Sequence, residues 1–228
     1  MTLSYLALAA LSCAAMAFVA SLLSDQVRTL VTGEIEAGKV LRKKTYLAFG
    51  FGLIFFAPLF VPNHFSSSFQ LAAFCIFSLV LYVLFICDLE TMVLPDFLTK
   101  PLLWLGLLFS CTAYSDVSPE NAIFGAAFGY LSLFVINAVS RLAMGRQGIG
   151  GGDFKLLAAI GAFGGFKIAA LTLLLVPFVG VASYFVIPKR LISEDGEMPL
   201  GLSLAICGMV GLLFGESICD YYFTLVHL

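Results

Sequence analysis

Long apolar runs separated by short polar segments repeat along the whole chain. Most of these runs are close to the roughly 20 residues that a membrane-spanning helix needs. They cover residues 3–23, 45–61, 69–87, 101–114, 122–143, 154–166, 168–188 and 199–218. The pattern predicts an all-α polytopic integral membrane protein with about eight transmembrane helices, organised as a single membrane domain over residues 1–228.

Three of the runs have features that bear on their structure. The run 154–166 would be about 20 Å long at 1.5 Å per residue, which is short for a bilayer core of about 30 Å. In the run 168–188 we expect Pro177 to interrupt the helix. The run 3–23 has no basic segment before it and is long for a signal peptide, so we expect it to be a retained span.

Composition supports a membrane protein and excludes several other classes. The chain is 61% hydrophobic and 11% charged, whereas soluble domains are about 45–50% apolar and about 25% charged. A net charge of −2 gives no reason to expect a nucleic-acid partner. No two of the six cysteines form a C-x-x-C pair, so we expect neither a zinc site nor a disulfide framework.

The cations are distributed very unevenly between the two sides of the predicted topology. If the spans alternate in direction, Lys167 alone lies on one side. The other side holds Arg28, Lys39, Arg42, Lys43, Lys44, Lys100, Arg141, Arg146, Lys155, Lys189 and Arg190. Because basic loops remain in the cytoplasm, the topology has both termini in the periplasm. The segments 24–44, 88–100 and 146–155 then face the cytoplasm, and 24–44 is the first cytoplasmic loop.

A glycine-rich loop at 148–153 ends on a carboxylate, Asp153, at the start of an apolar helical run. It is not a phosphate-binding loop, because its Lys follows Phe154, and a dinucleotide fingerprint would need Gly in place of Asp153. Taken alone, Asp153 is equally well explained as the N-cap of the next helix. We expect the glycines, Gly150 and Gly152 among them, to adopt positive φ and to allow close backbone approach.

A second acidic segment begins where the third run ends, with Asp88, Glu90 and Asp96 within nine residues. The predicted topology allows Asp88 and Asp153 to meet at one cytoplasmic cavity. Two carboxylates about 4 Å apart repel by about 4 kcal/mol at an effective dielectric constant of 20, so one would stay protonated while the other is ionised. The ionised group can take a proton from water and the protonated one can polarise a carbonyl. This is aspartyl-protease chemistry, and it needs no metal ion.

The two segments together resemble a known family. Gly150-Gly151-Gly152-Asp153, followed by Phe154-Lys155-Leu156-Leu157, is similar to the GxGD motif of the type IV prepilin leader peptidases, and Asp88 with Leu94-Pro95-Asp96 is similar to their first aspartate motif. The resemblance covers about residues 80–225, which would form the peptidase core. It implies that Asp88 and Asp153 are catalytic and that Gly150, Gly152, Glu90, Pro95, Asp96 and Lys155 belong to the supporting motifs.

The resemblance also implies a substrate and a location. Members of the family lie in the bacterial inner membrane and remove the basic leader of type IV prepilins or type II secretion pseudopilins at the cytoplasmic face, after a Gly. The substrate is a single hydrophobic helix that lies in the lipid bilayer. The peptidase needs no cofactor, and S-adenosylmethionine is implied only for members that also methylate the new N-terminus. Such members usually have C-x-x-C pairs in the first cytoplasmic loop, and 24–44 contains no cysteine.

The sequence is compatible with several alternatives. Glu90 and Asp96 either solvate the loop and cap the next helix, or tune the catalytic pair and contact the basic leader. Lys155 either supports Asp153 electrostatically or anchors the topology. Two rival functions are a small cation- or proton-coupled transporter with the glycine loop as its hinge, and a presenilin-like intramembrane protease. The sequence does not indicate an oligomeric state.

Overall fold

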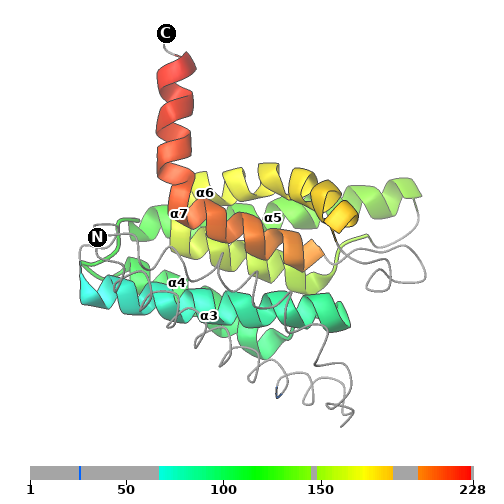
Figure 1. The fold of residues 1–228 in the computed structure, drawn as a ribbon, viewed down its shortest axis with the longest axis horizontal. Helices are drawn as coiled ribbons and strands as arrows, with labels where there is room; N and C mark the ends of the chain where they lie inside the picture. The colour runs from blue at the N-terminus through cyan, green and yellow to red at the C-terminus, as the bar shows by residue number, and fades with distance from the viewer. Residues whose placement is uncertain (1–25, 27–66, 145–147, 187–199, 227–228) are drawn as a thin grey trace, which may run out of the picture. The chain divides into compact units, whose positions relative to one another are not determined.

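The computed structural model describes Gln26 and residues 67–144, 148–186 and 200–226 (Figure 1). The predicted spans 3–23 and 45–61 lie outside these residues, as does the loop 24–44 apart from Gln26. The chain divides into two compact units, Met1–Thr91 and Met92–Leu228.

The first unit contributes one described helix, α3 (Ser68–Thr91). Its start is capped by Ser67, whose Oγ accepts a hydrogen bond from the Phe69 amide at 3.0 Å. In its last turn the Thr91 hydroxyl donates to the Cys87 carbonyl at 2.8 Å. The helix stops there because Met92 has a φ of 53°, a left-handed conformation that ends helices.

The second unit consists of α4 (Asp96–Ser110), α5 (Pro119–Met144), α6 (Gly151–Val186) and α7 (Leu200–Val226). The central helix is α6, which packs against α4, α5 and α7 (Figure 1). The start of α5 is set by Pro119 in the first position and by Ser118, whose Oγ accepts a hydrogen bond from the Asn121 amide at 3.3 Å.

A sharp break divides α6 at Gly165, which has φ +78° and ψ −177°. Only glycine adopts this conformation without strain. The break lies near the end of the predicted run 154–166, two residues before Lys167, which separates that run from 168–188. The expected interruption at Pro177 is wrong, because α6 continues through that residue. A membrane helix tolerates the loss of the hydrogen bond that a proline removes, because neighbouring helices can satisfy the freed backbone group.

Glycines bring α5 and the first half of α6 into backbone contact. A Cβ added to Gly125 would lie 2.6 Å from the Gly165 carbonyl carbon, and one added to Gly129 would lie 2.7 Å from the Leu157 carbonyl oxygen. Gly161 faces the backbone of Gly125 in the same way. We call Gly125, Gly129 and Gly161 the glycine seam. Small residues four apart allow membrane helices to approach this closely.

The prediction of an all-α membrane protein is confirmed at this level. Within the described residues every regular element is a helix, and three helical segments are long and apolar enough to cross a membrane: Ser68–Leu89, Pro119–Ala143 and Gly151–Ser183. Leu200–Gly215 is a shorter apolar helix. The number of eight spans and the periplasmic position of the termini stay predictions.

Candidate active site

Asp88 lies in the last turn of α3, a predominantly apolar helix. Its relative exposure is 4%, and the preceding residues Leu84, Phe85 and Cys87 are buried as well. Glu90 belongs to the same final turn, and its side chain lies outside the described part of the chain. A buried carboxylate in an apolar helix is costly, which marks Asp88 as a candidate functional residue.

Asp153 is the third residue of α6 and has a relative exposure of 7%. The helix begins two residues earlier, at Gly151, so Asp153 lies in the first turn and not at the N-cap. Its backbone amide donates to the Gly150 carbonyl at 3.2 Å. A Cβ added to Gly150 would lie 3.3 Å from Oδ2 of Asp153, so this glycine leaves room directly beside the carboxylate.

The expectation of positive φ in the glycine loop is wrong. Among the described glycines only Gly165 has a positive φ. The reason is that α6 already begins at Gly151, so that Gly151 and Gly152 adopt helical backbone angles. The other expectation, close backbone approach, is confirmed at Gly152, where an added Cβ would lie 2.6 Å from Cβ of Leu94.

The contact between Gly152 and Leu94 joins parts of the two sequence motifs within the second unit. Leu94 is followed by Pro95, which occupies the N-cap position of α4 with an extended backbone and no side-chain cap. An added Cβ at Gly152 would also lie 3.1 Å from the Leu94 carbonyl oxygen. Any side chain at position 152 would therefore push the segment 94–96 away from the start of α6.

Asp96 and Lys155 form a second link between these two segments. The Lys155 ammonium donates to Oδ1 of Asp96, and Lys100, one turn further along α4, lies 2.8 Å from Oδ2. Lys155 is thus paired with Asp96, and Asp96 is ion-paired at the start of α4. Hydrogen bonds from Lys100 and then from Lys155 hold the pKa of Asp96 below its usual range.

We expect the Asp96→Asn variant to show a pH-dependent loss of stability. Because the pKa of Asp96 is lowered in the folded state, its ion pairs stabilise the protein above the ordinary carboxyl pKa of about 3.9, and this contribution disappears as the pH falls through the folded-state value. The effect should be small, since the side chain is about half exposed. In detergent, the midpoint of thermal unfolding should be lower for the variant than for the wild type at pH 7, and the two midpoints should converge in acid. A difference between the midpoints that grows in acid would contradict the assignment.

Two further features of the glycine loop were not found from the sequence. The amides of Gly148 and Ile149 both donate to Oδ1 of Asn137 on α5, at 3.3 and 3.2 Å. Phe154 is buried and packs edge-on against Tyr130 and Phe134 of α5, with ring centroids 5.8 and 6.3 Å away. These contacts fix the loop and the first turn of α6 on α5.

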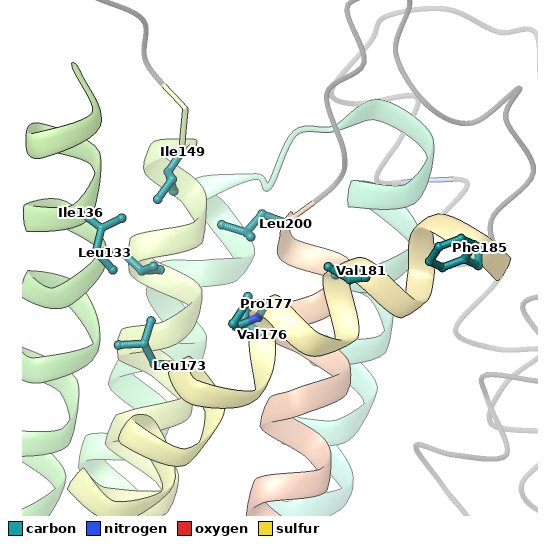
Figure 2. A pocket seen from close by; sticks show the side chains of 10 residues that line it. Leu133, Ile136, Ile149, Leu173, Val176, Pro177, Val181, Phe185 and Leu200 are labelled. Atoms are coloured by element: carbon teal, nitrogen blue, oxygen red, sulfur yellow. The ribbon is translucent and has the colours of Figure 1, made fainter. Parts of the chain in front are cut away.

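An open apolar pocket of about 640 Å³ lies beside the glycine loop (Figure 2). Ile149 forms one wall, so the pocket borders the loop that precedes Asp153. The remaining lining residues come from α5, the second half of α6 and the start of α7: Leu133, Ile136, Leu173, Val176, Pro177, Gly180, Val181, Phe185 and Leu200.

Comparison with known proteins places these features in a family. The model of the Type IV leader peptidase family matches residues 75–185, a segment that contains Asp88, Asp153 and both motifs. A prepilin leader peptidase/N-methyltransferase of Stutzerimonas stutzeri is 38% identical over 170 residues, which are 74% of this chain and 58% of the relative.

Proteins of the same name from other bacteria give similar values. The one from Pseudomonas aeruginosa is 39% identical over 164 residues, covering 72% of this chain and 56% of the relative. The one from Aeromonas hydrophila is 43% identical over 146 residues, covering 64% of this chain and 50% of the relative. The chain therefore spans about half the length of these relatives, between 50% and 58%. No solved structure matches. Through the segment 75–185, which holds both aspartates, the chain belongs to the type IV leader peptidase family.

Proposed function

We propose that the protein is an aspartyl endopeptidase that removes the basic leader of type IV prepilins or type II secretion pseudopilins. The observation that carries the proposal is that the family segment contains two buried aspartates, Asp88 and Asp153, each at the end of an apolar helix. The relatives are named prepilin leader peptidases. The enzyme would act at the cytoplasmic face of the bacterial inner membrane, where the predicted topology places both motifs.

The covalent chain supports a meeting of the two aspartates. From Asp88 to the end of α3 at Thr91 the helix rises by about 4.5 Å, and the three residues to Leu94 span at most about 11 Å. The Cα atom of Asp88 is therefore within about 15 Å of the Cα atom of Leu94. Leu94 packs on Gly152, the residue before Asp153. The length of the chain between Asp88 and Leu94 therefore permits the proposed pair.

The helix ends suggest different roles for the two carboxylates. Asp153 lies in the first turn of α6, where the partial positive charge of the helix end favours an ionised carboxylate. Asp88 lies in the last turn of α3, where the partial negative charge of the helix end disfavours one. We therefore assign Asp153 as the base that takes a proton from water and Asp88 as the protonated group that polarises the scissile carbonyl.

The supporting residues hold the base in place. Gly150 leaves space beside Oδ2 of Asp153, and Gly152 lets the segment that contains Pro95 pack against the first turn of α6. The ion pair between Asp96 and Lys155 ties the same two segments together. Such rigid support increases catalysis, because a small displacement of a reacting group is costly.

The direct test is to incubate the purified protein with a prepilin and to measure intact masses. We expect the substrate to lose the mass of its basic leader, with cleavage after the Gly. A cation or proton transporter, the rival interpretation of two buried aspartates, would leave the prepilin intact and show an ion flux in vesicles. An unchanged prepilin mass with folded protein would contradict the proposal.

The same assay separates the second activity in the relatives' names, N-methyl transfer. S-adenosylmethionine, the methyl donor, is added to half of the reactions, and methyl transfer would add one methyl increment to the cleaved product. We propose no cofactor for the peptidase step itself. The described residues contain no cluster of three His, Cys, Asp or Glu that could hold a metal ion, and the loop 24–44 lies outside them apart from Gln26.

A further inference from the structure

Two asparagines on α5, Asn121 and Asn137, accept hydrogen bonds from the backbone at opposite ends of the first half of α6. At the break in α6, the amide of Phe166 donates to Oδ1 of Asn121 at 3.0 Å. At the glycine loop, the amides of Gly148 and Ile149 donate to Oδ1 of Asn137 at 3.3 and 3.2 Å. Both asparagines therefore accept hydrogen bonds from irregular backbone, Asn121 at the break in α6 and Asn137 in the loop before the helix.

The glycine loop depends on such an anchor more than an ordinary loop does. Glycine has the largest backbone freedom of any residue, and Gly148, Gly150, Gly151 and Gly152 provide four of the five residues before Asp153. A Cβ added to Gly148 or Gly151 would find no neighbour within 4 Å, so packing contributes little at these two positions. The two hydrogen bonds to Asn137 therefore hold the loop in place where packing at Gly148 and Gly151 does not.

The hydrogen bonds from Gly148 and Ile149 to Asn137 lie only four residues before Asp153 at their nearest point. Ile149 donates to Asn137 and is followed by Gly150, whose carbonyl oxygen accepts the Asp153 amide at 3.2 Å. The Cβ position of Gly150 is 3.3 Å from Oδ2 of Asp153. A shift of the loop at Ile149 would thus be transmitted directly to the carboxylate. Ile149 is also a wall of the apolar pocket (Figure 2).

We propose that Asn137 is a positioning residue for the peptidase reaction: by holding Gly148 and Ile149, it fixes where the carboxylate of Asp153 lies. Asn121 makes the same kind of contact at the far end of the half-helix and fixes only the break at Gly165. The kinetic part of this inference rests on the proposed function, whereas the anchoring of the loop does not.

The first test uses hydrogen exchange and is independent of any activity. In Asn137→Leu, which has a side chain of similar size without an acceptor, we expect the amides of Gly148 and Ile149 to exchange at least about fivefold faster, as the loss of a typical hydrogen bond predicts. In Asn137→Asp, which keeps an acceptor at the same position, exchange should stay near the wild-type rate. Unchanged exchange in Asn137→Leu would overturn the proposed anchor.

The second test compares cleavage kinetics with a prepilin substrate. We expect Asn137→Leu to lower kcat about ten- to a hundredfold, the effect of a misplaced reacting group, with KM within about twofold of the wild type. Asn137→Asp should restore most of kcat. The matched control, Asn121→Leu, should be less stable to heat and should keep kcat within about twofold.

The outcomes separate the two ideas. If the wild type does not cleave, the proposed function fails, and hydrogen exchange still decides the anchor. If the wild type cleaves and both leucine variants lower kcat equally, the contact is only structural and the positioning role is overturned. If Asn137→Leu does not accumulate in the membrane, Asn137→Asp provides the test. If the amides of Gly148 and Ile149 exchange slowly in Asn137→Asp while its kcat is more than about tenfold below that of the wild type, the positioning role is contradicted.

Discussion

Replacing either Asp88 or Asp153 by asparagine is expected to abolish prepilin cleavage. Asparagine has nearly the same shape as aspartate but can neither take a proton from water nor carry one to the leaving group. The loss of a general acid or base lowers rates by about a hundred- to ten-thousandfold, so we expect no detectable product in a single-time-point assay. The measurement is the intact mass of a prepilin incubated with equal amounts of each purified variant.

The control for this experiment is an aspartate outside the candidate site. Asp116 is exposed in the connection between α4 and α5, and Asp116→Asn should cleave at the wild-type rate. Both site variants should accumulate in the membrane like the wild type, because asparagine preserves the size of the side chain. Substantial activity of asparagine at position 88 or 153 would remove that residue from the catalytic pair.

Alanine at Gly161 or Gly125 is expected to destabilise the protein strongly. In an ordinary helix, replacing glycine by alanine stabilises by up to about 1 kcal/mol. In the glycine seam the added methyl would overlap the backbone of the facing helix, and overpacking of this kind costs about 1–3 kcal/mol. The methyl forces α5 away from α6 and disturbs the support of Asp153. Thermal unfolding in detergent should show a clearly lower midpoint.

Gly180 provides the matched control for the seam. It also lies inside α6, but a Cβ there would meet only Oγ of Ser203, at 3.8 Å, an ordinary van der Waals contact. Gly180→Ala should therefore be neutral or slightly stabilising. An equal effect of alanine at positions 161 and 180 would show that backbone contact at the seam does not hold α5 and α6 together.

The helices of the second unit were largely predictable because their apolar runs are long. The predicted run 122–143 corresponds to α5 (Pro119–Met144), and the break in α6 lies two residues before the predicted boundary between 154–166 and 168–188. Pro177 was misleading, since a proline in a packed membrane helix loses one hydrogen bond without ending the helix. The chain turns instead at Gly165, where the backbone has a positive φ.

The candidate site was only partly predictable for a different reason. Asp153 and Gly152 stand in a recognisable local motif, whereas the contacts that hold them come from distant parts of the chain. Lys155 pairs with Asp96, which is 59 residues away, and Gly152 packs on Leu94. Asn137 lies within an apolar run and has no motif around it. Such contacts follow from how α4 and α5 pack on α6, which hydrophobic periodicity alone does not determine.

The most direct test of the catalytic pair is a proximity measurement between positions 88 and 153. All six native cysteines are replaced, cysteines are introduced by Asp88→Cys and Asp153→Cys, and membranes are treated with a mild oxidant or with the shortest bifunctional thiol reagent. Because a disulfide requires Cα atoms within about 7 Å, efficient cross-linking reports close approach. The pair 88 and 116 serves as the control. We predict rapid cross-linking of 88 with 153 and little of 88 with 116; no cross-link between 88 and 153, even with prepilin present, would contradict a shared catalytic site.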